Sequence, residues 1–173
     1  GNKYSFSLTL FDTEVAQIYT NESIIKVKKL DTESYRPFGN TALYDAVCKT
    51  IDEVKNMVKK DQKVLTVIMT DGEENSSKEY SREQLKVKIA ELEKAGNWSF
   101  VFLGANQDSW DNAAKIGIST MNAANFLATD VGMAKSMNMM ASNTRAFASS
   151  TEIKTTTFFS KKDQYDLTAD DKK

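Results

Sequence analysis

The chain has 173 residues, 40% of them hydrophobic and 27% charged, which is enough for one ordinary globular domain. Lysine and arginine (23) nearly balance aspartate and glutamate (24), so the net charge of -1 gives no general attraction to nucleic acid or to an anionic membrane. The absence of histidine excludes Ser-His-Asp and Cys-His catalysis and histidine-ligated zinc. The single cysteine, Cys48, falls in a helical pattern and is expected to be a core thiol of a cytoplasmic protein.

The first part of the chain predicts a β-hairpin. Residues 4–11 alternate between apolar and polar side chains, which is typical of a strand with one buried face. A partner strand is expected from Val15 to a second turn at residues 21–23, and residues 24–30 could extend that edge. A loop at residues 31–40 follows.

Helices and strands alternate in the rest of the chain. Apolar spacing, capping residues and glycines predict helices at 41–59, 81–95, 108–116 and 129–148, and strands at 63–70, 98–103 and 121–127. This order predicts an α/β fold with an antiparallel edge hairpin. The segment 149–173 is polar, and we expect a weakly ordered tail that docks through Phe158 and Phe159.

The strand at 63–70 carries the strongest functional signal. It is a short apolar run that stops at Asp71 and Gly72, and ligands of open α/β sheets bind just outside the carboxyl ends of strands. A second loop, Gly39 to Ala46, precedes a helix and offers the hydroxyl of Thr41. A hydroxyl and a carboxylate suit Mg²⁺, but they are too few alone for its roughly six oxygen ligands.

Each of these residues also has a purely structural interpretation. Thr41 could be only a helix N-cap, and Asp71 with Gly72 could be only a turn. Glu73 and Glu74 are expected to be solvated turn charges, and Asp45 is expected on the helix surface or behind the ligands, because acids are favoured in the first turn of a helix.

The stretches GNTALYDAV and KVLTVIMTDGEENSS resemble the von Willebrand factor type A domain, in particular its small bacterial and phage versions. SFSLTLFDTEV is similar to the second strand of that family running into the third, and WSFVFLGANQD to the fifth strand. The resemblance implies a Rossmann-like domain at 1–148, with a mostly parallel central sheet, an antiparallel edge strand and helices on both faces.

In that family, a metal-ion-dependent adhesion site is assembled from three loops that carry Asp-x-Ser-x-Ser, a Thr and an Asp. Thr41 matches the second loop and Asp71 the third. The resemblance therefore implies that they bind Mg²⁺ or Mn²⁺, and that a protein partner completes the coordination with an acidic side chain. Six further residues would form the rim of this site: Gly39, Asn40, Gly72, Glu73, Asn75 and Asn106.

One departure from the family is large. The 173 residues contain no Asp-x-Ser-x-Ser motif, so we expect the chain to begin at the second strand of the family and the metal to be absent if the motif is truly missing. The strands at 4–11 and 63–70 would then lose the neighbour they share. A missing N-terminal segment, a strand supplied by another polypeptide, and a rearranged sheet without a metal site are the three explanations.

Three functions follow from these observations. The first is a non-catalytic, metal-dependent protein-binding module that binds neither nucleic acid nor membrane. The second is a structural or assembly protein with a vestigial metal site, whose exposed strand edge would favour self-association. The third is a phosphoryl-transfer enzyme with Asp71 as nucleophile. The third is disfavoured because Glu73 stands where haloacid-dehalogenase-like phosphatases have a second aspartate, and because no phosphate-binding glycine loop is present.

Overall fold

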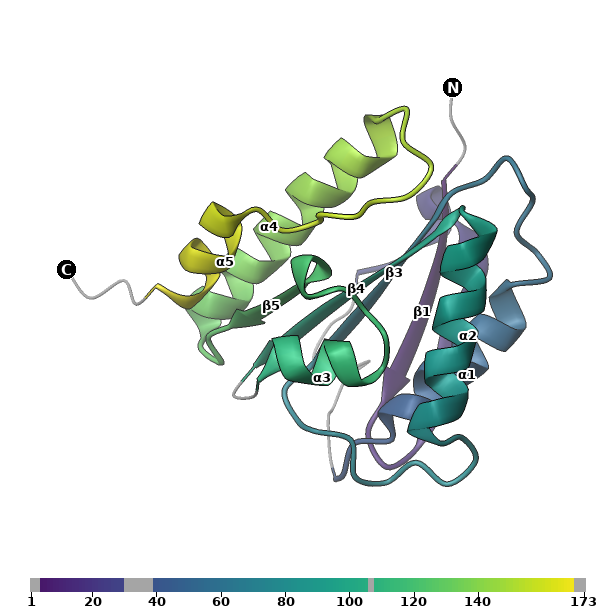
Figure 1. Ribbon diagram of the computed structural model, residues 1–173, viewed down its shortest axis with the longest axis horizontal. Helices are drawn as coiled ribbons and strands as arrows, with labels where there is room; N and C mark the ends of the chain where they lie inside the picture. The colour runs from purple at the N-terminus through teal and green to yellow at the C-terminus, as the bar shows by residue number, and fades with distance from the viewer. Residues whose placement is uncertain (1–3, 30–38, 106–107, 170–173) are drawn as a thin grey trace. The chain divides into compact units, whose positions relative to one another are not determined.

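The structure is a computed structural model that describes residues 4–29, 39–105 and 108–169 (Figure 1). Its secondary structure is mixed α and β, which confirms the predicted α/β class. The chain divides into two compact units, the first built from residues 1–59 and 74–85 and the second from residues 60–73 and 86–173.

The first unit contains an antiparallel hairpin and one long helix. Strand β1 (Ser5–Phe11) pairs with β2 (Val15–Ser23), and the short 3₁₀ helix η1 (Ile24–Lys26) follows. Helix α1 (Leu43–Val54) packs on both strands and buries Cys48 completely, as expected for a core thiol.

The predicted turn at residues 21–23 is wrong, because β2 continues through Ser23. Asn21 adopts a positive φ of 50°, and its amide donates to the Ser7 hydroxyl at 2.9 Å. The ladder between the two strands shifts register near Leu8, so the irregularity is absorbed within the hairpin. Residues 24–26 form η1 and do not extend the strand.

The second unit is built on a parallel sheet with the strand order β3-β4-β5. These strands are β3 (Val64–Thr70), β4 (Trp98–Ala105) and β5 (Ala123–Phe126), which follows the short η2 (Thr120–Asn122). Every residue of the central strand β4 is buried. Helix α2 (Arg82–Ala95) connects β3 to β4, and α3 (Ser109–Lys115) lies between β4 and β5 in the chain.

The predicted ends of α2 are confirmed in detail. The Ser81 hydroxyl accepts the Gln84 amide at 3.3 Å, and the Gln84 side chain accepts the Ser81 amide at 2.8 Å, which is the expected capping box. Gly96 follows the helix with a φ of 92°, a left-handed conformation that favours glycine.

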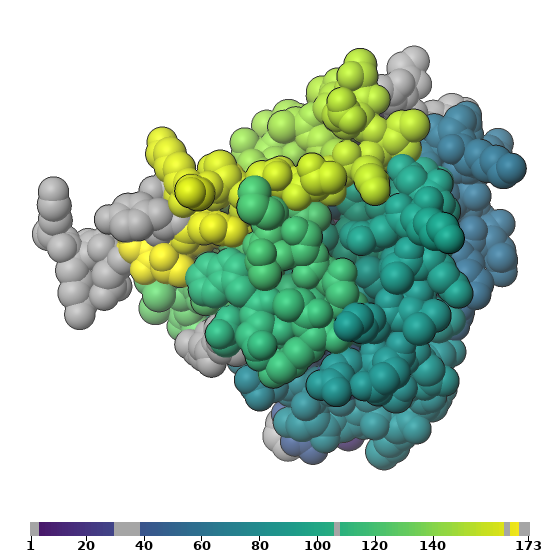
Figure 2. Space-filling model, in the orientation of Figure 1, coloured from purple at the N-terminus to yellow at the C-terminus, as the bar shows by residue number. Residues whose placement is uncertain are grey.

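Helices α4 (Asp130–Ser149) and α5 (Lys161–Thr168) cover one face of the parallel sheet, while α3 lies on the viewer's side of it in Figure 1. The segment after α4 was expected to be a weakly ordered tail that docks through Phe158 and Phe159. It contains the helix α5 and forms a band along the surface of this unit (Figure 2, yellow). Phe158, Phe159 and Leu167 from that segment pack with residues of β4 and β5 in one buried cluster. Among the described helices, none combines the length and the apolar character needed to cross a membrane.

The strands form two sheets where one continuous sheet was expected. In the described residues, β1 pairs only with β2, and β3 pairs only with β4. Both strands therefore stand at a sheet edge. Strand β3, which carries no charged residue, is therefore paired on one side only among the described strands.

Candidate functional site

The start of helix α1 is capped by residues about thirty positions away in the sequence. The N-cap residue is Ala42, which has no side chain that could accept a hydrogen bond, so Thr41 is not the N-cap. The Tyr44 amide donates to the Glu74 carboxylate at 2.9 Å, and the Asp45 amide donates to the Ser77 hydroxyl at 3.1 Å. The segment after β3 therefore supplies the partners that the first turn of a helix requires.

Glu74 is the centre of this cap. One carboxylate oxygen accepts the amides of Ser76 and Ser77 at 2.9 and 2.7 Å, and the other accepts the Ser77 hydroxyl at 2.7 Å in addition to the Tyr44 amide. The side chain is thus a structural anion at the positive end of α1. The expectation that Glu74 is a solvated turn charge is wrong, because four donors surround it.

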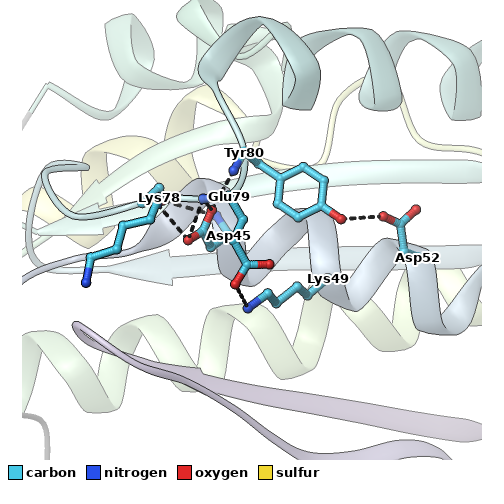
Figure 3. A network of polar contacts seen from close by, with 7 residues as sticks. Asp45, Lys49, Asp52, Lys78, Glu79 and Tyr80 are labelled. Carbon is cyan, nitrogen blue, oxygen red and sulfur yellow. Dashed lines mark hydrogen bonds and ion pairs between the residues drawn. The ribbon is translucent and has the colours of Figure 1, made fainter.

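Asp45 is a second structural carboxylate, and it is only 5% exposed (Figure 3). Its oxygens accept the backbone amides of Lys78, Glu79 and Tyr80 at 2.8, 3.0 and 2.8 Å. Burial acts to raise the pKa of Asp45, but the three amides stabilise its charged form and lower the pKa overall. The expectation that Asp45 lies on the helix surface is therefore wrong.

Two contacts at the rim of this network hold the same loop to α1 (Figure 3). The Tyr80 hydroxyl donates to Asp52 at 3.0 Å, which raises the pKa of Tyr80. Lys49 forms an ion pair with Glu79 at 2.7 Å, which raises the pKa of Lys49. Asp45, Lys49 and Asp52 project from one side of the helix, so the loop 74–80 lies along α1.

Thr41 and Asn75, two of the residues predicted for the site, are in direct contact. The Thr41 amide donates to the Asn75 side chain at 2.8 Å, and the Asn75 amide donates back to the Thr41 carbonyl at 3.0 Å. The Ser76 amide also reaches the Thr41 carbonyl, at 3.3 Å. The Thr41 hydroxyl makes no hydrogen bond to any residue that the structure describes, so its backbone is fixed while its side chain is available.

The turn of the β-hairpin positions the residues just before Thr41. The Asn40 amide donates to the Thr13 hydroxyl at 3.0 Å, and the Ala42 amide donates to the Asp12 carbonyl at 2.7 Å. Gly39 has a φ of 104°, and a Cβ there would lie 2.6 Å from the Thr13 hydroxyl. Glycine is therefore required at this position both by conformation and by space.

Asp71, Gly72 and Glu73 belong to the second unit, at the carboxyl end of β3. The Thr70 hydroxyl donates to the Gly72 carbonyl at 2.9 Å and closes a tight turn. Asp71 and Glu73 are exposed, and neither carboxylate contacts a partner within the described part of the chain. Asn106, the remaining rim residue, lies outside the described residues.

Among the described residues, the structure adds no further metal ligand to the two that the sequence indicates, Thr41 and Asp71. Within residues 4–29, 39–105 and 108–169, no three carboxylate or thiol side chains gather as a metal site would require. A free hydroxyl at Thr41 and a free carboxylate at Asp71 are chemically suited to Mg²⁺ or Mn²⁺, but each ion needs about six ligands. Asp45 and Glu74 cannot help, because backbone amides occupy their oxygens.

Comparison with known proteins gives no family assignment. No protein-family model matches the chain. A search of curated proteins also finds no significant match.

Proposed function

We propose that this chain is a protein-binding module of the von Willebrand factor type A class, with a Rossmann-like fold. In this proposal, Mg²⁺ or Mn²⁺ is bound by Thr41 and Asp71, and an acidic side chain of a protein partner completes the coordination. The resemblance of the sequence around these two residues to the metal-binding loops of that family supports their role as ligands. The proposal contains no catalytic step.

The free hydroxyl of Thr41 is the observation that supports this function most strongly. A threonine before a helix ordinarily caps it, but here Glu74 and Ser77 do so. The Asn75 side chain accepts the Thr41 amide, and the amides of Asn75 and Ser76 donate to the Thr41 carbonyl, so the backbone of Thr41 is held at both groups. A hydroxyl that stands on a fixed backbone and has no hydrogen-bond partner among the described residues is suited to bind a ligand.

The anchored loop gives the proposed site its rigidity. Four donors fix Glu74 and three amides fix Asp45, so the loop that carries Asn75 is held to α1 without help from a ligand. A pre-organised rim loses little conformational entropy when a partner binds. The rim residues in this unit are Gly39, Asn40 and Asn75.

Paramagnetic line broadening by Mn²⁺ tests the proposal without a known partner. Substoichiometric Mn²⁺ added to the ¹⁵N-labelled chain should broaden the amide signals of Asp71 and Thr41 before others. The Asp71→Ala variant should lose this broadening and keep its fold, whereas Asp61→Ala, which removes an exposed carboxylate before β3, should not. Equal broadening in wild type and Asp71→Ala would contradict the metal assignment.

A structural or assembly protein with a vestigial metal site is the second candidate. The short donor set favours it, since no acidic cluster is present in the described residues. It predicts that EDTA changes neither stability nor association with other chains. A Mn²⁺ response at millimolar concentration would count against it.

A further inference from the structure

Strand β3 has the composition of a central strand but stands at the edge of its sheet. Its seven residues, VLTVIMT, contain no charge, and all of them pair with β4 in an unbroken parallel register. Its other side has no strand partner among the described strands. Val67, at its middle, is 40% exposed.

This edge lacks the devices that protect natural sheet edges. Charged side chains, proline, bulges and short length all discourage the pairing of an edge with another chain. Strand β3 has none of these between Lys63 and Asp71, whereas β5, at the opposite edge, has only four residues. The backbone groups on the open side of β3 therefore form a template for one more strand.

We infer that this edge pairs with the same edge of a second copy of the chain, antiparallel about Val67. A twofold axis at Val67 sets Leu65 opposite Met69, and Lys63 opposite Asp71, of the other copy. The apolar residues then face one another, and each end of the ladder brings a cation and an anion to the same side of the dimer axis. A parallel arrangement would place Lys63 beside Lys63 and Asp71 beside Asp71, which is unfavourable.

The charges at the two ends of β3 favour this register over the parallel one without forming a direct ion pair. The Lys63 ammonium already donates to the carbonyls of Phe147, Ser150 and Glu152 at 2.6, 2.9 and 3.2 Å, so its charge stays at the start of the strand and acts on Asp71 of the other copy only through space. Asp71 is exposed at the other end. The resulting dimer has one continuous sheet of six strands, in the order β5-β4-β3-β3-β4-β5.

Sedimentation velocity of the full chain in EDTA tests this inference. Because EDTA removes any bound metal, a dimer observed under these conditions does not depend on the proposed metal-dependent binding. We expect a species of twice the 19.4 kDa chain mass. Val67→Lys sets two like charges together at the axis and should weaken the dimer at least about tenfold. The matched control is Val87→Lys, a change at a valine of α2 that is 56% exposed, and it should leave the dimer intact.

Cross-linking tests the register directly. Only the residue on the axis lies opposite itself, so Val67→Cys should form a covalent dimer on oxidation or with a short bismaleimide, while Val87→Cys should not. The native Cys48 is fully buried and should not react. A chain that sediments as a monomer at high micromolar concentration, or a folded Val67→Cys that does not cross-link, would overturn the inference. So would a monomer with slowly exchanging β3 amides, because another segment would then cover this edge.

Discussion

Replacing Asp45 by asparagine tests whether the carboxylates at the start of α1 hold the first unit together. In the wild type, one oxygen accepts the amides of Glu79 and Tyr80, and the other accepts that of Lys78. Asparagine keeps one acceptor but turns an NH₂ group toward the amide of Lys78. The substitution therefore removes a charge and places two donors face to face.

The size of the effect follows from these three bonds. A hydrogen bond to a charged group contributes about 1.5–3 kcal/mol to stability. Lys78 and Glu79 are exposed, so their amides regain water when the carboxylate is lost, whereas Tyr80 is half-buried. We therefore expect Asp45→Asn to lower the free energy of unfolding by roughly 2–3 kcal/mol, a large share of the 5–15 kcal/mol typical of a domain.

Urea unfolding followed by far-ultraviolet circular dichroism measures this loss, because circular dichroism follows the helix and strands of the first unit directly, whereas Trp98 and Trp110 both belong to the second unit. Amide hydrogen exchange at residues 78–80 should accelerate in the variant. Glu53→Gln, at an exposed carboxylate of α1, is the control. A loss no larger than that of the control, with unchanged exchange at Tyr80, would refute the assigned role of Asp45.

Two further predictions concern the stability of the separate units. The pKa of Asp45 is lowered below its ordinary 3.8, so the carboxylate stabilises the folded state above about pH 4. This stabilisation is lost as the pH falls through the lower pKa of the folded state. An acid titration followed by circular dichroism should show the loss in the wild type and not in Asp45→Asn. In the second unit, a Cβ at Gly132 would clash with the Leu127 carbonyl oxygen, so Gly132→Ala should lower the free energy of unfolding, followed by tryptophan fluorescence, by about 1–3 kcal/mol. The exposed Ala141→Ser in the same helix is its control, and an equal effect of the two would disprove the close contact.

Local sequence signals predicted most of the helices and strands. The capping box at Ser81 and the glycine after α2 formed as expected, because both depend on residues only a few positions apart. Helix α5 was not predicted, since it is a short polar stretch whose burial depends on Phe158, Phe159 and Leu167 packing with distant strands.

The anchored loop could be predicted only in part. The bonds from Glu74 to the amides of Ser76 and Ser77 are local, and a carboxylate followed by two nearby serines is a usable signal for them. Glu74 accepts the Tyr44 amide and Asp45 accepts the Lys78 amide across about thirty residues, and no pattern along the chain specifies such a pairing. The same limit applies to the sheets, because the strand order follows from tertiary contacts.

The affinity of Thr41→Val for Mn²⁺ is the most direct test of the proposed metal-dependent binding. Valine keeps the shape of threonine but removes the hydroxyl, which has no hydrogen-bond partner among the described residues, so stability in EDTA should change by less than about 0.5 kcal/mol. Mn²⁺ binding, measured by calorimetry or by line broadening at Asp71, should weaken at least about tenfold. Unchanged Mn²⁺ affinity in this folded variant would show that Thr41 is not a metal ligand.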